Sequence, residues 1–230
     1  MKYEVILFDA DETLFDFKKS EREAFKNSMI QFGFDYDENY HLKIYQEINT
    51  AIWKEFEEGL ITQAKLKVDR FKRLSDKLEV SFDAEEFAKA YMEHLANGSF
   101  LYEGCTELLE DLHKSHKLSI VTNGLTSVQD KRIRKSTVSK YFDTVVISEE
   151  ILISKPNPEI FNHTLKTIDY SDKSKVLMVG DSLTSDIQGG INFGIDTCWY
   201  NPKRLENKTS INPTYEVSNF DELKELLLNS

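Results

Sequence analysis

Two carboxylates separated by one residue, Asp9 and Asp11, directly follow the short apolar run at residues 5–8. A run of β-branched and aromatic residues of this length is typical of a buried strand. In an open α/β sheet, ligands bind beyond the carboxyl ends of the strands, so this pair could supply a nucleophile, a metal ligand and an acid or base in one place. Asp is also common in turns and helix caps, and for this pair alone that structural role is the favoured interpretation.

Two more polar motifs follow later strand patterns and suit the binding of an anion. Thr122 and Asn123 end the strand pattern at residues 118–122 and precede a helix start, so they could offer a hydroxyl, an amide and backbone N–H groups to a phosphate. Lys155 lies at a helix entry, where Pro156 favours an extended backbone. Its ammonium could neutralise an anion at the strand ends, although a lysine at a helix entry is more often simply solvated.

A fourth motif adds carboxylates to the same predicted edge. Asp181 follows the apolar pattern at residues 176–180, and Asp186 begins a helix five residues later, where it could also be a helix cap. Carboxylates that crowd around Asp9 would repel one another and raise each other's pKa unless a cation is present. A small set of oxygen ligands suits Mg²⁺, with waters and a substrate phosphate completing the octahedron.

The elements that would position these residues fall into two regions. Residues 1–15 and 99–230 alternate strand and helix patterns, which predicts a parallel sheet covered by helices on both faces. Residues 16–98 contain helical patterns instead, including an apolar residue at every fourth position from Tyr40 to Phe56. We therefore expect a helical unit inserted after the first strand. The predicted strands lie at residues 3–9, 118–122, 144–148, 176–180, 196–200 and 215–218.

Composition limits the classes of partner and compartment. The chain has 230 residues, of which 40% are hydrophobic and 30% are charged, as in a globular protein. A net charge of −11 argues against a nucleic-acid polymer as partner, and no apolar run reaches the roughly 20 residues of a membrane span. The first strand pattern starts at once, so we expect no signal peptide. The two cysteines, Cys105 and Cys198, are expected to be buried in a cytoplasmic protein.

Together, the four motifs resemble the haloacid dehalogenase (HAD) superfamily of phosphohydrolases. The order Asp9-x-Asp11-x-Thr13, Thr122, Lys155 and Gly180-Asp181-x4-Asp186 matches that family. The resemblance spans essentially the whole chain, because the helical insert looks like the family's cap. It implies the α/β class, with a doubly wound Rossmann-like parallel sheet at residues 1–15 and 99–230 and an α-helical cap domain at residues 16–98.

The resemblance also implies roles for the site residues. Asp9 would be the nucleophile that forms an aspartyl-phosphate, and Asp11 would protonate the leaving oxygen and then deprotonate the attacking water. Thr122 and Asn123 would hold phosphate oxygens, while Lys155 would offset negative charge at the catalytic site. Mg²⁺ would be bound by Asp9, the backbone carbonyl of Asp11 and Asp181, with Asp186 in a supporting role.

Asp11 and the residues near it in the sequence indicate which reaction of the family to expect. Dehalogenases of the family carry no acid at that position, because a halide leaves without protonation, so Asp11 favours cleavage of a phosphate ester. Glu12 and Leu152 stand where relatives usually have glycine. The variant motif around Glu12, together with Leu101 to Gly104, resembles the pyrimidine 5′-nucleotidase branch.

The expected substrate is therefore a small phosphorylated metabolite, specifically a nucleoside 5′-monophosphate. Three alternatives stay open: a phosphatase of another small phosphometabolite, a phosphomutase that recaptures the intermediate with a second phosphoester, and a non-enzymatic phospho-switch of the receiver type. The oligomeric state is open between monomer and dimer.

Overall fold

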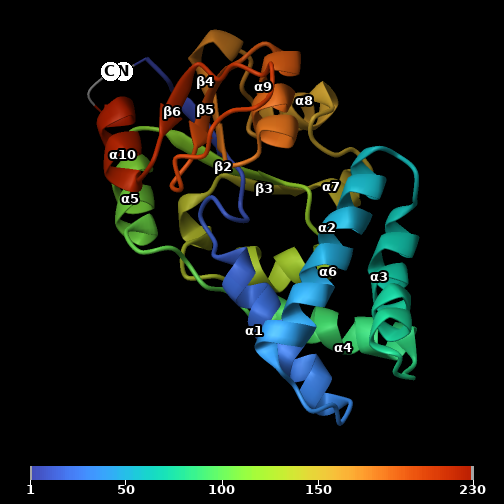
Figure 1. Cartoon of the computed structure of the whole chain (residues 1–230). Coiled ribbons are helices and arrows are strands. Elements are labelled where there is room, and N and C mark those ends of the chain that lie inside the picture. The colour runs from blue at the N-terminus through green and yellow to red at the C-terminus, as the bar shows by residue number, and fades with distance from the viewer. Residues whose placement is uncertain (1, 229–230) are drawn as a thin grey trace. The chain divides into compact units, whose positions relative to one another are not determined.

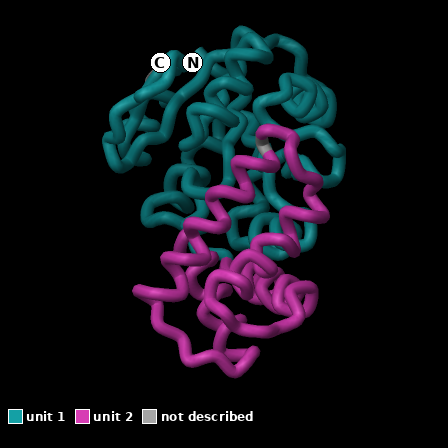
Figure 2. Tube along the Cα trace, turned by 45° about the vertical axis from the view of Figure 1, so that its right-hand side comes forward, with its two compact units in different colours: residues 1–17, 99–230 teal, residues 18–98 magenta. Residues whose placement is uncertain are grey.

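The structure, a computed structural model, describes residues 2–228 and contains two compact units. One unit comprises Met1–Phe17 and Ser99–Ser230, and the other comprises Lys18–Gly98 (Figure 2). Within the described residues, no helix combines the length and the apolar character needed to cross a membrane. The second unit is an insertion in the first, because both of its ends join the same unit.

The first unit contains a six-stranded sheet in which every neighbouring pair is parallel. The strand order is β3-β2-β1-β4-β5-β6, so the order reverses between β1 and β4, as in a doubly wound fold (Figure 1). The predicted α/β class is confirmed. The strands are β1 (Val5–Phe8), β2 (Lys117–Thr122), β3 (Thr144–Ile147), β4 (Val176–Gly180), β5 (Asp196–Tyr200) and β6 (Tyr215–Val217).

Side chains of β1 alternate between two hydrophobic clusters. Ile6 and Phe8 join the cluster that includes residues of α5 (Cys105–Leu112) and α10 (Phe220–Leu228), whereas the opposite cluster, with α8 (Pro158–Thr167) and α9 (Gln188–Phe193), contains Val5 and Leu7. Helices therefore cover both faces, which explains why β1 is a continuous apolar run. The shorter helices of this unit are α6 (Thr126–Gln129) and α7 (Ser148–Ile151). Cys105 and Cys198 are buried free thiols, as predicted.

Strand register brings the ends of the central strands together. Phe8 pairs with Ile120 of β2 on one side and with Val179 of β4 on the other. The pairing continues one residue further, because the N–H of Asp9 donates to the Val179 carbonyl at 2.9 Å. The segments after β1, β2 and β4 therefore leave the sheet at the same edge, at the point where the strand order reverses.

The second unit is built from helices around an aromatic core. Thr62 caps α3 (Gln63–Leu78) and Asp83 caps α4 (Ala84–Ala96), because their side chains accept hydrogen bonds from backbone N–H groups of the first turn. Five aromatic side chains of the unit are fully buried: Phe25, Tyr45, Phe71, Phe87 and Tyr91. The helices are α1 (Phe17–Gln31), which begins at the unit boundary, α2 (Lys43–Glu57), α3 (Gln63–Leu78) and α4 (Ala84–Ala96).

One expectation for this unit needs correction. The spacing of four residues from Tyr40 predicts one long helix with that stripe as its buried face. The helical turn at Glu38–Leu42 does run directly into α2, but it leaves Tyr40 exposed. The buried residues of α2 include Tyr45, Asn49 and Ile52. The reason is geometric: an α-helix has 3.6 residues per turn, so a stripe spaced by four rotates away from the core.

Candidate active site

Asp9 lies at the carboxyl end of β1, and its carboxylate is almost completely buried. Its Oδ1 accepts a hydrogen bond from the Lys155 ammonium at 2.6 Å, and its Oδ2 lies 3.4 Å from the Thr13 hydroxyl. The backbone N–H of Asp9 anchors the residue to β4 through the Val179 carbonyl. Asp9 is thus a fixed carboxylate at the point where ligands bind in doubly wound sheets.

Lys155 is buried and has three partners, so it is not the solvated lysine of an ordinary helix entry. Its Nζ lies 2.6 Å from Asp9 Oδ1, 2.7 Å from Asp186 Oδ1 and 2.6 Å from the Val121 carbonyl oxygen. Burial lowers the pKa of Lys155, but the negative charges of Asp186 and Asp9 outweigh it and raise the pKa overall. The side chain is therefore a fixed cation between two carboxylates.

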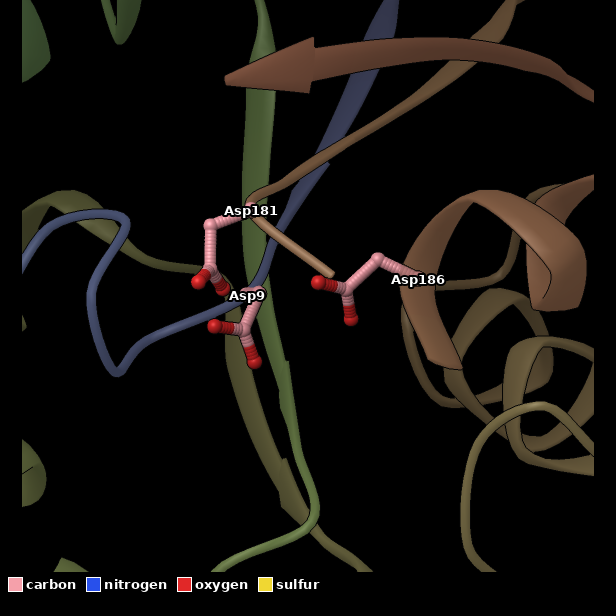
Figure 3. A group of neighbouring side chains, drawn as sticks. All are labelled: Asp9, Asp181 and Asp186. Carbon is pink, nitrogen blue, oxygen red and sulfur yellow. The ribbon is translucent and has the colours of Figure 1, made fainter. Parts of the chain in front are cut away.

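Three of the predicted carboxylates converge. One oxygen from each of Asp9, Asp181 and Asp186 lies within 4.8 Å of the others, and the side chains point toward one another (Figure 3). Asp181 follows β4, whereas Asp186 lies in the helical turn Leu183–Ile187. The backbone N–H of Ser182 donates to Asp186 Oδ2 at 3.0 Å and holds that carboxylate in place.

The electrostatics of this cluster favour a bound cation. Burial, followed by repulsion from Asp186 and Asp11, raises the pKa of Asp9 to about 7 although Lys155 opposes the shift. Burial and the charges of Asp9 and Asp186 raise the pKa of Asp181 to about 8. One ammonium cannot balance three carboxylates, and carboxylate oxygen is the donor that Mg²⁺ prefers. The residues present therefore fit a magnesium ion.

The Asp11 side chain lies outside this cluster and has different partners. Its Oδ1 accepts from the Arg132 guanidinium at 2.6 Å, and its Oδ2 accepts from the Gln129 amide at 2.7 Å. No sequence pattern predicts Gln129 or Arg132, because a charged segment after a strand is normally a solvated helix face. One sequence signal is present: Gly124 lacks the side chain that would collide with Gln129.

Thr122 and Asn123, the predicted phosphate ligands, lie at the end of β2. The Thr122 Oγ1 accepts from the Gly124 N–H at 3.2 Å and from Gln129 at 3.3 Å, which leaves its hydroxyl hydrogen to donate. The Asn123 side chain bridges to the backbone of Lys155, donating to its carbonyl at 2.9 Å and accepting from its N–H at 2.8 Å. In this structure the Asn123 side chain thus fixes the backbone of Lys155.

The chain is similar to known proteins along almost its whole length. Residues 6–200 match the model of the haloacid dehalogenase-like hydrolase family. The chain is 36% identical to pyrimidine 5′-nucleotidase YjjG of Escherichia coli (strain K12) over 99% of both chains. It is 38% identical to pyrimidine 5′-nucleotidase PynA of Streptococcus pneumoniae (strain ATCC BAA-255 / R6), over 99% of this chain and 96% of the relative.

A solved structure has the same fold over nearly its full length. The Bacillus subtilis protein YfnB, named as a HAD-hydrolase and described as bound to magnesium, superposes with a TM-score of 0.93 at 33% identity and covers 99% of each chain. The resemblance expected from the sequence motifs, including that to the pyrimidine 5′-nucleotidase branch, is thus confirmed. The chain belongs to the haloacid dehalogenase-like hydrolase family.

Proposed function

We propose that this protein is a Mg²⁺-dependent phosphatase that hydrolyses pyrimidine nucleoside 5′-monophosphates through an aspartyl-phosphate intermediate. The observation that carries the proposal is the fixed Asp9 carboxylate, with Lys155 at 2.6 Å and Asp181 and Asp186 in the same cluster. A nucleophile, a cation and a metal-binding set are the parts that phosphoryl transfer requires.

The side chains divide the reaction between them. A carboxylate oxygen of Asp9 attacks phosphorus, the new P–O bond forms as the ester P–O bond breaks, and Asp11 gives a proton to the leaving oxygen. Asp11 then takes a proton from the water that cleaves the aspartyl-phosphate, which releases phosphate and restores Asp9. Lys155 and the Thr122 hydroxyl stabilise negative charge on the phosphoryl group.

Magnesium would be held by Asp9, Asp181 and the backbone carbonyl of Asp11, with Asp186 alongside. When bound, it would neutralise charge on the phosphoryl oxygens and on the crowded carboxylates. Asp186 would act mainly through Lys155, because its Oδ1 is 2.7 Å from that ammonium.

The choice of substrate rests on relatives and on Asp11. Two relatives that align over almost their whole length are named as pyrimidine 5′-nucleotidases, which supports a pyrimidine nucleotide for this chain. Asp11 supports ester cleavage over dehalogenation, since an alkoxide leaving group needs a proton and a halide does not.

The helical unit is proposed to be the cap domain that selects the substrate. The two segments that lead into and out of it run side by side: the Asp16 N–H donates to the Phe100 carbonyl at 2.9 Å, and the Tyr102 N–H donates to the Leu14 carbonyl at 3.1 Å. Paired connections of this kind give a lid one common hinge. Closing the lid would exclude water from the aspartyl-phosphate.

A phosphate-release screen over phosphorylated metabolites with Mg²⁺ tests the proposal. Pyrimidine nucleoside monophosphates are expected to release stoichiometric phosphate without a bisphosphate activator, which a phosphomutase would need. Asp9→Asn should be folded and inactive, because an amide cannot form the acyl phosphate. A folded Asp9→Asn protein with near wild-type turnover would refute the mechanism.

A further inference from the structure

Asp11 is held by a closed ring of hydrogen bonds that the proposed reaction does not itself require. Arg132 Nη1 donates to Asp11 Oδ1 at 2.6 Å and to Gln129 Oε1 at 3.0 Å. Gln129 Nε2 donates to Asp11 Oδ2 at 2.7 Å. Both oxygens of the carboxylate are thus engaged, which restricts its rotation about the bond that joins it to Cβ. Each oxygen keeps a second lone pair, which can carry the proton that Asp11 gives and takes in the proposed reaction.

The donors are themselves immobilised. The Arg132 side chain is completely buried, while the Asp11 side chain keeps 25% of its surface exposed. The guanidinium carbon lies 5.2 Å from the ring centroid of Phe17 and 5.9 Å from that of Phe15. The Ser99 hydroxyl donates to the Arg132 backbone carbonyl at 2.6 Å. A buried cation is costly unless it is paired, so Arg132 has a strong preference for this geometry.

Gln129 links this ring of hydrogen bonds to Thr122, the proposed phosphate ligand. Its Nε2 also lies 3.3 Å from Thr122 Oγ1, and the side chain is buried. A Cβ atom on Gly124 would lie 2.3 Å from Gln129 Nε2, so glycine at that position is required for the amide to lie here. One amide group therefore contacts both the proposed phosphate-binding hydroxyl and the proposed acid.

We infer that Arg132 and Gln129 are positioning residues, which fix the Asp11 carboxylate relative to the phosphate-binding end of β2 for proton transfer to the leaving group. The inference rests on the proposed function, in which Asp11 is the general acid. It predicts a dependence on the leaving group. A ribose 5′-oxygen needs a proton to depart, whereas p-nitrophenolate departs without one, so only the first substrate needs a well-placed Asp11.

The test compares two substrates in one variant. Arg132→Met keeps the bulk of the side chain and removes its hydrogen bonds. With saturating Mg²⁺, we expect kcat/KM to fall by about 10²-fold for a pyrimidine nucleoside monophosphate and by less than about threefold for p-nitrophenyl phosphate. The ratio kcat/KM is used because it reports the steps up to phosphoryl transfer to Asp9 and not the later hydrolysis.

Gln129→Met is the second variant and carries the test if Arg132→Met does not fold. It removes the hydrogen bond to the Asp11 carboxylate, together with those to Arg132 and Thr122, and keeps the direct pair between Arg132 and Asp11, so the same selective loss is expected at about tenfold. Arg134→Met is the matched control, since Arg134 lies two residues on and makes an equally short ion pair, at 2.6 Å, with Glu150. It should leave both substrates unchanged, and melting temperatures establish that each variant is folded.

The outcomes separate this inference from the proposed function. An equal loss on both substrates, or no loss on either, would overturn the positioning role of Arg132 and Gln129. Asp11→Asn provides the reference, because it should show the same dependence on the leaving group more strongly. If Asp11→Asn shows the dependence and the two variants do not, the positioning inference fails and the phosphatase mechanism stands. If Asp11→Asn shows none, the acid role itself fails.

Discussion

A Cβ atom on Gly180 would lie 2.3 Å from Oδ2 of Asp186. The last residue of β4 must therefore lack a side chain for the carboxylate to reach its place. From there Asp186 accepts from the Ser182 N–H at 3.0 Å and pairs with Lys155 at 2.7 Å. The glycine of the Gly-Asp motif thus leaves room for Asp186. Asp186 in turn pairs with the ammonium of Lys155.

Replacing this glycine should damage the site more than the fold. We expect Gly180→Ala to lower the unfolding free energy by about 1–3 kcal/mol through overpacking. We also expect kcat/KM of the folded variant to fall strongly, because Asp186 and Lys155 must shift. Gly194→Ala is the control: its φ of +83° makes alanine strained, but nothing lies within 4 Å of the new Cβ. Urea unfolding and kcat/KM of both variants decide the matter, and a Gly180→Ala enzyme with unchanged activity would contradict this account.

Metal-free protein should lose stability as the pH rises through the range of the site carboxylates. The pKa of Asp9 is raised to about 7 and that of Asp181 to about 8, so between about pH 4 and pH 7 the folded state holds protons that the unfolded state has released. The unfolding free energy therefore falls with pH in this window. Melting temperatures in EDTA should decrease from pH 5 to pH 8.

Added Mg²⁺ should raise the melting temperature more at pH 8 than at pH 5, because the ion binds deprotonated carboxylates. Asp181→Asn is the control, since an amide does not titrate. It should flatten the pH dependence in EDTA and weaken the effect of Mg²⁺. A metal-induced shift that is equal at both pH values would argue against the carboxylate cluster as the binding site.

The features that the sequence predicts well are those that depend on local pattern. The apolar runs locate the strands of the core. Ligands bind at the carboxyl ends of parallel strands, and this rule places Asp9 and Asp181, which directly follow β1 and β4, at one edge of the sheet. Lys155 does not directly follow a strand, and its place in the site is expected only from the family resemblance. The register of β1 with β2 and β4 is not predicted in this way, because both faces of β1 are buried and a slip by one residue would still bury apolar side chains.

The features that the sequence does not predict are buried polar groups whose partners are distant in the chain. Arg132 has charged neighbours in the sequence, and its buried guanidinium is paired with Asp11, which lies 121 positions away. In the helical unit, Asn49 of α2 is buried. Its side chain donates to Glu21 at 2.8 Å and accepts from Arg70 at 3.0 Å. Hydrophobic periodicity carries no information about such partners.

Leu152 stands where the family resemblance leads us to expect glycine, and its backbone conformation is unfavourable for a residue with a side chain. It ends α7 with a φ of 56°, and its side chain is 88% exposed. The left-handed conformation costs a non-glycine residue about 1–2 kcal/mol of folded-state free energy. Glycine avoids this cost but loses about 0.5–1 kcal/mol more backbone entropy on folding. Leu152→Gly should therefore raise the unfolding free energy by up to about 1 kcal/mol in urea titrations.

Leu152→Ala is the matched control, because it removes the exposed side chain and keeps the strained backbone. It should unfold at the same urea concentration as the parent protein. Equal stabilisation by alanine and glycine would mean that the exposed leucine, and not its backbone conformation, is the unfavourable feature.

Substrate choice separates a nucleotidase from a general phosphatase. We expect kcat/KM for UMP or dTMP to exceed that for small sugar phosphates by about tenfold to a few hundredfold, the range available to a pocket that reads a base mainly by shape. The physical reason is that, if the helical unit is the proposed cap, binding energy from the nucleoside would be used to close it and to align the phosphate with Asp9. Initial rates of phosphate release for each substrate, with Asp9→Asn as the control for contaminating phosphatases, give the ratio. If phosphoglycolate or a hexose phosphate is the best substrate, the nucleotidase assignment is wrong, while loss of that activity in Asp9→Asn would still support the aspartyl-phosphate chemistry.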